Sequence, residues 1–481
     1  MTDGPDFVSP HRLWTEEQHA AARRVSQTID ELGLRLIRVS FPDQHGVLRG
    51  KTLTRDAFGH ALREGHRMAS TLLLKDTSHR TIYPVFSERG GLGRPELSGV
   101  ADIVAVPDPT TFRTLPWTPD TGWVLCDLYH PDGAPVPLAS RRVLAATLER
   151  LAGHGMAYRT GLEVEFHVFR ITDARREPAH AGQPGEPVEV AHLGRGYQLN
   201  TEVWLDDMDE VVHLVADTAA GLGLPLRSIE NEFGPSQLEA TFEPATGLAT
   251  ADTMVLFRSA VKQVCRRRGY HATFMCRPQV PETAASGWHL HQSLVDLSTG
   301  RNAFAPERAE DAPLSQVGMH FLGGLLRHAA AATVFAAPTI NSYKRYRRFS
   351  LAPDRILWGV DNRGALLRVI SSGQASRIEN RGGDPTANPY LYLASQLAAG
   401  LDGLGTRADP GPPSTDPYDA AAQPLPGSLM EALAALRADP VFAEAFGRLI
   451  VDYVADLKAA EVGRFLAEVT DWEQREYFEL F

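Results

Sequence analysis

The sequence contains few cysteines and no excess of positive charge. Its 481 residues include only Cys126, Cys265 and Cys276, with no CxxC pair. Because structural zinc sites are usually built from paired cysteine motifs, we expect none here, and the pattern suits thiols kept reduced in the cytosol. The formal net charge of −11 argues against sequence-independent nucleic-acid binding, which requires clustered cations.

Long hydrophobic runs are also absent. The longest apolar stretch, residues 329–340, is shorter than the roughly 20 residues that a membrane-spanning helix needs. The first residues carry neither a basic nor an apolar segment, which predicts no signal peptide. The hydrophobic fraction of 43% and the charged fraction of 22% are ordinary for a globular protein. We therefore expect a cytoplasmic enzyme that binds neither nucleic acid nor membrane.

The order of predicted elements indicates more than one domain in a chain of this length. Apolar spacing predicts a helix over residues 17–32. Alternating patterns predict strands over residues 34–41, 47–53, 102–108 and 121–127. The turn-rich segment 131–137 predicts a domain boundary. We expect a leader and helix over 1–32, a small domain over 33–132 and a large domain over 133–481.

Helix signals continue through the larger part. Ser140 is predicted to cap a helix that ends near Gly153. Asn388 before Pro389 predicts another start, because Asn caps well and Pro fits the first helical position. Further amphipathic helices are predicted over residues 206–222 and 250–268.

One strand-like stretch, residues 161–169, carries two carboxylates on one face. Apolar residues alternate there with Glu163, Glu165 and His167, so the two glutamates point to the same side of a sheet. Two like charges at this spacing repel each other. A solvated sheet edge would relieve the repulsion, and a divalent cation bound between the carboxylates would relieve it better.

More candidate ligands follow on other strand-like stretches. His289 and His291 share one face of residues 286–294, and Glu232 and Glu239 flank a Gly-Pro turn. A third stretch places Arg377, Glu379 and Arg381 on one side. Several acids together with histidines on separate strands favour Mg²⁺ or Mn²⁺ sites.

These stretches resemble the motifs of the glutamine synthetase family, in the family's order and from about Leu34 to Phe481. The matching segments are Glu163-Val-Glu165, Glu232-Phe-Gly-Pro-Ser-Gln-Leu-Glu239, Gly287-Trp-His289-Leu-His291, Pro338-Thr-Ile-Asn-Ser-Tyr-Lys-Arg345 and Arg377-Ile-Glu379-Asn-Arg381. The resemblance implies an α+β fold, with a small N-terminal β-grasp domain and a large catalytic domain. In the latter a curved antiparallel sheet is backed by helices.

The resemblance also implies an activity and an assembly. Family members use ATP to join the γ-carboxylate of glutamate to an amine through γ-glutamyl phosphate, with two or more Mg²⁺ (or Mn²⁺) ions in each active site. They form closed homo-oligomers of stacked six-membered rings, so a dodecamer is expected. The active site then lies between two subunits.

The matching positions imply residue roles. One ion is expected on Glu165, Glu232 and Glu239, and another on Glu163, His289 and Glu379. The substrate side is expected to use Arg345 and Arg381 for glutamate, Glu165 beside them, and Tyr197 and Leu351 near the amine. His291, Ser293 and Arg377 match the nucleotide side, and Arg363 and Arg368 match catalytic arginines that face the phosphates. Glu230 and His167 are expected to lie outside the ligand set.

The chain departs from the family pattern where ammonia is bound. Leu351 occupies the position at which ammonia-using members carry a glutamate, and no matching aspartate follows Gly65, although Asp76 lies downstream. Losing a base and gaining apolar surface favours an alkyl or aryl monoamine. A glutamine synthetase that uses ammonia, a γ-glutamylpolyamine synthetase and a non-catalytic family member are the alternatives.

Overall fold

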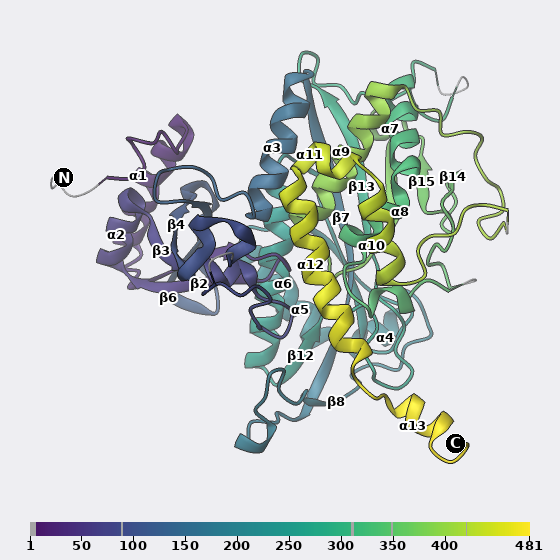
Figure 1. Cartoon of the computed structure of the whole chain (residues 1–481), viewed down its shortest axis with the longest axis horizontal. Helices are drawn as coiled ribbons and strands as arrows, with labels where there is room; N and C mark the ends of the chain where they lie inside the picture. The colour runs from purple at the N-terminus through teal and green to yellow at the C-terminus, as the bar shows by residue number, and fades with distance from the viewer. Residues whose placement is uncertain (1–5, 88–89, 309–311, 348–349, 420) are drawn as a thin grey trace.

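The computed structural model describes residues 6–87, 90–308, 312–347, 350–419 and 421–481 (Figure 1). The fold is α+β, as the sequence predicts. A smaller region, built around one sheet, lies beside a larger region in which a second sheet is covered by helices. Segment 130–139 links the two regions. The exact domain limits and the β-grasp assignment stay predictions.

The N-terminal sheet has the strand order β2-β1-β6-β4-β3, with β5 paired to β6. Its first two strands form an antiparallel hairpin, and β1 runs parallel to β6. The elements of this region are α1 (Glu16–Glu31), β1 (Leu36–Pro42), β2 (Leu48–Thr54), α2 (Arg55–Glu64), β3 (His66–Ala69), β4 (Asp102–Pro107), β5 (Arg113–Leu115) and β6 (Thr118–Tyr129).

The larger sheet has the order β14-β15-β16-β13-β7-β10-β9, and β8, β11 and β12 also pair with β7. Its strands are β7 (Met156–Asp173), β8 (Glu189–Ala191), β9 (Leu226–Asn231), β10 (Gln237–Phe242), β11 (Ala245–Thr246), β12 (Tyr270–Thr273), β13 (Trp288–Asp296), β14 (Trp358–Val360), β15 (Leu367–Ile370) and β16 (Arg377–Gly383). β7 is therefore the strand on which the others are assembled.

Helices cover the sheet, and α12 crosses the front of the view in Figure 1. They are α3 (Ser140–Gly153), α4 (Glu202–Asp206), α5 (Asp209–Gly221), α6 (Ala249–Arg267), α7 (Gln316–Arg327), α8 (Ala329–Ala336), α9 (Pro389–Thr406), α10 (Leu429–Ala438), α11 (Val441–Phe446), α12 (Arg448–Leu466) and α13 (Asp471–Tyr477). The core between sheet and helices includes Phe166, which stacks on Phe274 with ring centres 5.1 Å apart.

Two helix starts test the capping predictions. Asn388 caps α9 through its side chain, which accepts hydrogen bonds from the backbone of Tyr390 and Leu391, as predicted. The prediction that Ser140 caps α3 is wrong. Ala139 is the cap residue and Ser140 is already helical, and its buried hydroxyl has no partner among the described residues. The helix therefore begins without a side-chain cap.

A buried arginine joins the two regions of the molecule. Arg141 of α3 contacts three aspartates: Asp108 after β4 at 2.9 Å, Asp127 of β6 at 2.8 Å and Asp252 of α6 at 3.0 Å. Only 6% of the arginine side chain is exposed. Asp108 and Asp127 belong to the smaller region, whereas Asp252 and Arg141 belong to the larger one. The arginine therefore holds the two regions together.

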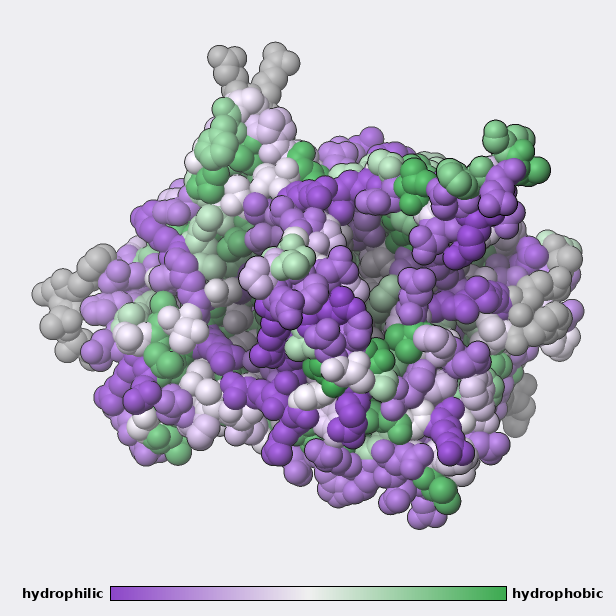
Figure 2. Space-filling model, turned by 90° about the horizontal axis from the view of Figure 1, so that it is seen from below, coloured by the Kyte–Doolittle hydropathy of each residue, from purple (hydrophilic) through white to green (hydrophobic). Residues whose placement is uncertain are grey.

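One face of the molecule is mainly polar (Figure 2). Figure 2 shows one face, on which hydrophilic residues predominate and hydrophobic residues gather in small separate patches. Among the described residues, no helix has both the length and the hydrophobicity needed to cross a lipid bilayer.

Candidate functional site

Strand β7 positions the two carboxylates that the sequence singles out. Leu162, Val164 and Phe166 point into the core and are buried. Glu163 and Glu165 alternate with these residues, and therefore point to the opposite face of the sheet. The alternating pattern thus separates a packing face from a polar face on one strand.

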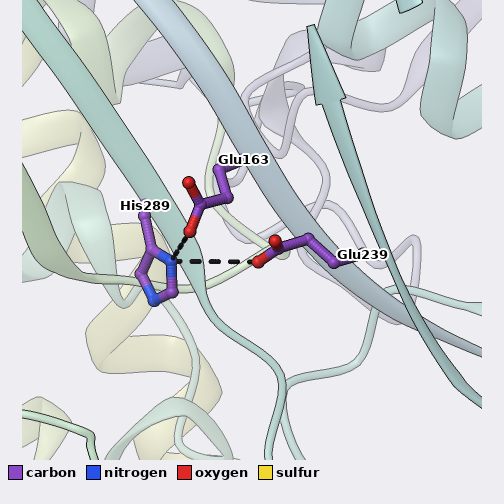
Figure 3. Close-up of side chains that lie close together, drawn as sticks. All are labelled: Glu163, Glu239 and His289. Atoms are coloured by element: carbon purple, nitrogen blue, oxygen red, sulfur yellow. Dashed lines mark hydrogen bonds and ion pairs between the residues drawn. The ribbon is translucent and has the colours of Figure 1, made fainter. Parts of the chain in front are cut away.

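Neighbouring strands bring a histidine and a third carboxylate to the polar face (Figure 3). His289 of β13 pairs with Glu163, and Glu239 of β10 pairs with Glu165. His289 Nδ1 lies 2.7 Å from Glu163 Oε1 and 3.9 Å from Glu239 Oε2. One possible ligand atom from each of Glu163, Glu239 and His289 lies within 4.8 Å of the others, which is close enough to share one cation.

A second such group adjoins the first and also contains Glu163. His291 of β13 pairs with Glu379 of β16, and its Nε2 lies 3.1 Å from Glu163 Oε2. Possible ligand atoms of Glu163, His291 and Glu379 lie within 4.8 Å of one another. Glu163 therefore lies between two candidate ion positions.

Arginines balance one end of this cluster. Glu379 is completely buried and accepts hydrogen bonds from Arg368 Nη1 at 3.0 Å and from Arg381 Nη1. Burial would raise the pKa of Glu379, but the nearby His289 and Arg381 hold it below its usual value. Arg368 also contacts Asp361, so its guanidinium group is shared between a buried and an exposed acid.

The other end of the cluster has too much negative charge. Burial, followed by the charges of Glu163 and Glu165, raises the pKa of Glu239 to about 10. Burial and Glu232 raise the pKa of Glu165 to about 8. Burial lowers the pKa of His289 and so favours the neutral imidazole that binds metals. Divalent cations would relieve this crowding, so these residues fit Mg²⁺ or Mn²⁺.

Glu165 is held in place by two donors. Gln237 Nε2 and the backbone N–H of Gly287 both donate to Glu165 Oε2, each at 3.0 Å. A side chain at position 287 would start 2.5 Å from Arg345 Nη2, so a glycine is required for the arginine to come this close. The sequence analysis did not identify Gln237. Its position inside the Glu232–Glu239 motif is the one sequence feature that could have indicated a role at the site.

Arg345 and Arg381 are both buried, with 6% and 5% of their surface exposed. Arg345 Nη1 donates to the backbone carbonyl of Arg381 at 3.0 Å. The structure therefore brings together the two arginines expected to bind glutamate. Two buried guanidinium groups next to one another can recognise a carboxylate by paired hydrogen bonds.

The residues expected on the nucleotide side divide into two sets. Arg377 Nε donates to His291 Nδ1 at 3.1 Å, and Ser293 follows two residues later on the same face of β13, buried. Arg363 is exposed and lines a surface pocket with Asn362 and Ser414. Among the described residues, no hydrogen bond or ion pair joins Arg363 to the ligand cluster.

The residues expected near the amine are accessible. The hydroxyl of Tyr197 contacts Glu282, at 2.8 Å from its carbonyl oxygen and 2.9 Å from Oε2, and its ring packs edge-on against Phe233. Leu351 is 59% exposed. Residues 348–349, just before it, lie outside the described residues. Glu282 carried no sequence signal.

The two candidate ion positions differ from the sets inferred by resemblance. His291, expected to contact the nucleotide, belongs to one of the ligand groups. Within the described part of the chain, Glu165 and Glu232 belong to neither group, although Glu165 Oε1 lies 3.8 Å from His289 Nε2. His167 lies outside, buried against Ser286 Oγ at 3.3 Å. The assignment of ligands to individual ions stays a prediction.

The chain is similar to known proteins over most of its length. Residues 137–477 match the glutamine synthetase catalytic domain. The chain is 42% identical to γ-glutamylanilide synthase of Acinetobacter sp., over 100% of both chains. It is 35% identical to a γ-glutamylethanolamide synthetase of Streptomyces coelicolor, over 97% of this chain and 96% of the relative. The solved structure of GmaS without ligand is 30% identical, with a TM-score of 0.79, over 94% and 99% of the two chains.

Proposed function

Because the chain belongs to the glutamine synthetase family, we propose that it is an ATP-dependent ligase that joins the γ-carboxylate of glutamate to an organic amine. The observation that carries the proposal is the cluster of Glu163, Glu239, Glu379, His289 and His291 beside buried arginines. The names of two full-length relatives state that they make an anilide and an ethanolamide, both amides of organic amines.

The chemistry explains why such a site collects so much charge. A carboxylate does not react with an amine at neutral pH, because oxide is a poor leaving group. Transfer of the ATP γ-phosphoryl group to the carboxylate gives γ-glutamyl phosphate, whose phosphate can leave when the amine attacks. Both reactants of the first step are anions, so the site must offset their repulsion.

We propose that arginines divide this task. Arg345 and Arg381 would hold glutamate carboxylates through their planar donor groups. Arg368 and Arg377, whose present partners are Glu379, Asp361 and His291, would turn part of their donor capacity to the phosphates. Arg363 would reach the phosphates from the exposed side. Bound divalent ions, held by the glutamate and histidine cluster, would supply further positive charge where phosphate and carboxylate meet.

The amine is proposed to be an alkyl or aryl monoamine. Leu351 is apolar and exposed, and the ring of Tyr197 offers a second apolar surface. Asp76, which the sequence leaves as a possible substitute acid, is buried and ion-paired with Arg464 at 3.1 Å. Apolar area covered by an amine contributes roughly 25 cal/mol per Å², whereas ammonia would gain none of it.

Release of ADP with a panel of amines tests the proposal. We expect turnover with glutamate, Mg²⁺-ATP and a small alkyl or aromatic amine, weaker turnover with a polyamine and the weakest with ammonia. Leu351→Glu should shift the preference towards ammonia by about tenfold, because a base and a cation site are restored, and Leu351→Met is the matched apolar control. A wide preference of the wild-type enzyme for ammonia would contradict the choice of amine. No turnover with any amine would contradict the ligase itself.

Two further features are proposed on the same basis. The protein is expected in the cytoplasm and as a closed homo-oligomer, a dodecamer of stacked rings. The exposed aromatic residues of the C-terminal segment, Trp472 and Phe478 with 55% and 73% exposure, support an assembly that covers them. Light scattering tests the assembly, and an active monomer would contradict it.

A further inference from the structure

One cavity lies away from the ligand cluster and shares no lining residue with it. It has a volume of about 540 Å³, within the range of small-molecule sites. Its walls come from the β1–β2 turn, α6, the end of α8, the segment between β16 and α9, and α12. It thus lies where the N-terminal hairpin meets the larger region.

The walls are fixed by hydrogen bonds that do not depend on a ligand. Arg258 donates to the carbonyls of Gly46 at 2.7 Å, Pro385 at 2.8 Å and Ala387 at 3.0 Å. Asn388 Nδ2 donates to the carbonyl of Gln44 at 3.2 Å. Because these bonds connect the hairpin turn to the segment after β16, the cavity is a preformed feature of the fold.

The charged side chains of the lining are all cationic, and many of the other lining residues are apolar. Arg258, Lys262 and Lys458 line the cavity, and none of its lining residues is an aspartate or glutamate, although the chain as a whole has a net charge of −11. Val47 and Met275, which are 46% and 40% exposed, line it as well. A molecule in this cavity would therefore meet cations and hydrocarbon together.

Lys262 is the cation that is open to a ligand. Lys458 already pairs with Glu461 at 3.1 Å, and Arg258 is occupied by backbone carbonyls. Lys262 is exposed as a residue, and its side chain makes no hydrogen bond or ion pair to any described residue. Neighbouring atoms nevertheless bury its charged group, and this burial, followed by the charges of Arg258 and Arg266, lowers the pKa of Lys262. An anion beside the Lys262 ammonium would favour its charged form and so offset the effects of burial and of the two arginines.

We propose that this cavity binds small organic monoanions with an apolar body, such as aryl carboxylates, through an ion pair with Lys262. The carboxylate would meet the ammonium group, and the hydrocarbon part would cover Val47 and Met275. The site is distinct from the glutamate, ATP and amine sites. Pro338 and Thr339 on its walls precede Arg345 in the chain, and Pro385 and Thr386 follow Arg381.

Calorimetric titration of the full-length protein with 1-naphthoate and with the neutral 1-naphthamide tests the site. Naphthoate should bind at least about tenfold more tightly than naphthamide, as expected for a hydrogen-bonded ion pair. Lys262→Gln should abolish this difference. Arg267→Gln removes an exposed cation from the same helix and should leave it unchanged. Ser259→Trp, which fills the cavity without removing charge, should weaken both compounds.

Saturating glutamate and Mg²⁺-ATP should not compete with naphthoate. Competition would place the anion in the substrate site and overturn the proposal. Equal affinity of Lys262→Gln and wild type for naphthoate would also overturn it. If neither compound binds the wild-type protein, as when a second copy of the chain covers the cavity, the proposal is wrong. None of these readouts depends on ligase activity, so the proposed function stands or falls separately.

Discussion

Two buried charge clusters of this protein differ in how their negative charge is balanced. Around Arg141, aspartates from both regions converge on one guanidinium group, all within 3.0 Å. Burial would lower the pKa of Arg141, but Asp127 and Asp252 raise it well above its usual value. In the cluster around β7, by contrast, Arg368 and Arg381 hydrogen-bond to Glu379, and no described arginine pairs with Glu165 or Glu239, whose pKa values are raised. Burial also raises the pKa of Asp127, but there Arg141 is in direct contact with the carboxylate.

The difference separates a structural cluster from a functional one. Each aspartate of the Arg141 cluster contacts the guanidinium group directly, so this cluster stabilises the fold without a ligand from solution. A cluster with unbalanced carboxylates is costly in the free protein and gains its stability from a ligand. Buried carboxylates thus stabilise the fold where an arginine contacts them, and they form a binding site where the cation must come from solution.

The largest effect is expected from removing a carboxylate that both candidate ion positions share. Glu163→Ala should lower the rate of ADP release by at least about 10³-fold, because the charge that ions supply to phosphoryl transfer is worth several kcal/mol. EDTA treatment of the wild type should do the same, and Mg²⁺ should restore only the wild type. Full activity after EDTA would contradict the role of divalent ions, and circular dichroism should show an unchanged fold in the variant.

Removing the central cation of the Arg141 cluster should lower the stability of the fold. Arg141→Leu leaves Asp108 buried, and Asp127 and Asp252 partly buried, without their cation, and should lower the free energy of unfolding by about 3 kcal/mol. Thermal unfolding with and without Mg²⁺ measures the effect, and the loss should be the same in both. Arg142→Leu, on the exposed side of the same helix where it pairs with Glu149, is the control and should change little. A loss restored by Mg²⁺ would contradict the distinction between the clusters.

A third cluster, centred on the buried His328, should stabilise the fold in a way that depends on pH. His328 contacts Asp439 at 2.6 Å and Asp402 at 2.9 Å, and Asp402 also contacts Arg327. Burial would lower the pKa of His328, but its bonds to Asp439 and Asp402 raise it. The stabilisation is therefore present below the unfolded pKa of about 6.5 and is lost as pH rises through the folded pKa.

His328→Gln should accordingly cost about 1–2 kcal/mol near pH 6 and clearly less near pH 9. The difference in thermal midpoint between wild type and variant, measured at both pH values, gives the answer. His213→Gln is a suitable control, because His213 is exposed on α5. A difference that grows with pH would show that the sign of the pKa shift is wrong.

The smallest effect is also the most specific to the comparison. In EDTA near neutral pH, Glu239→Gln should raise stability by about 1 kcal/mol, because it removes a carboxyl group whose ionised form is disfavoured in the folded protein but not in the unfolded chain. Asp252→Asn should lower it, because Arg141 loses a charged partner. Added Mg²⁺ should stabilise the wild type more than Glu239→Gln, since an ion stabilises only the form that binds it. A loss of stability in Glu239→Gln without metal would contradict the claim of excess charge.

The sequence predicts these clusters unequally. Alternation along residues 161–169 and 286–294 is local, so it correctly places the face of Glu163, Glu165, His289 and His291. The Arg141 cluster joins residues more than 100 positions apart, and no local pattern marks its members. The same holds for Gln237, whose contact with Glu165 depends on strand register, and for the cavity beside Lys262, which exists only where two regions meet.

Residue type alone was misleading at Ser140. A serine before a helical run is a good cap by residue type, yet the backbone of α3 begins one position earlier. The family resemblance gave Arg345 and Arg381 one role, and the two lie next to each other in the structure, while their binding of glutamate stays a prediction. It could not indicate that His291 lies within a ligand group, because the distance to Glu163 depends on the packing of β13 against β7.

The eighteen-residue span of β7 has a consequence for how this scaffold can change. β7 is paired along its length with β8, β10, β11, β12 and β13. A residue inserted between Leu162 and Glu165 would rotate one carboxylate into the hydrocarbon interior and mismatch several neighbours at once. Substitutions on this strand can be repaired individually, whereas a change of length cannot. Attempts to diversify the enzyme should therefore vary loop lengths and keep the length of β7 constant.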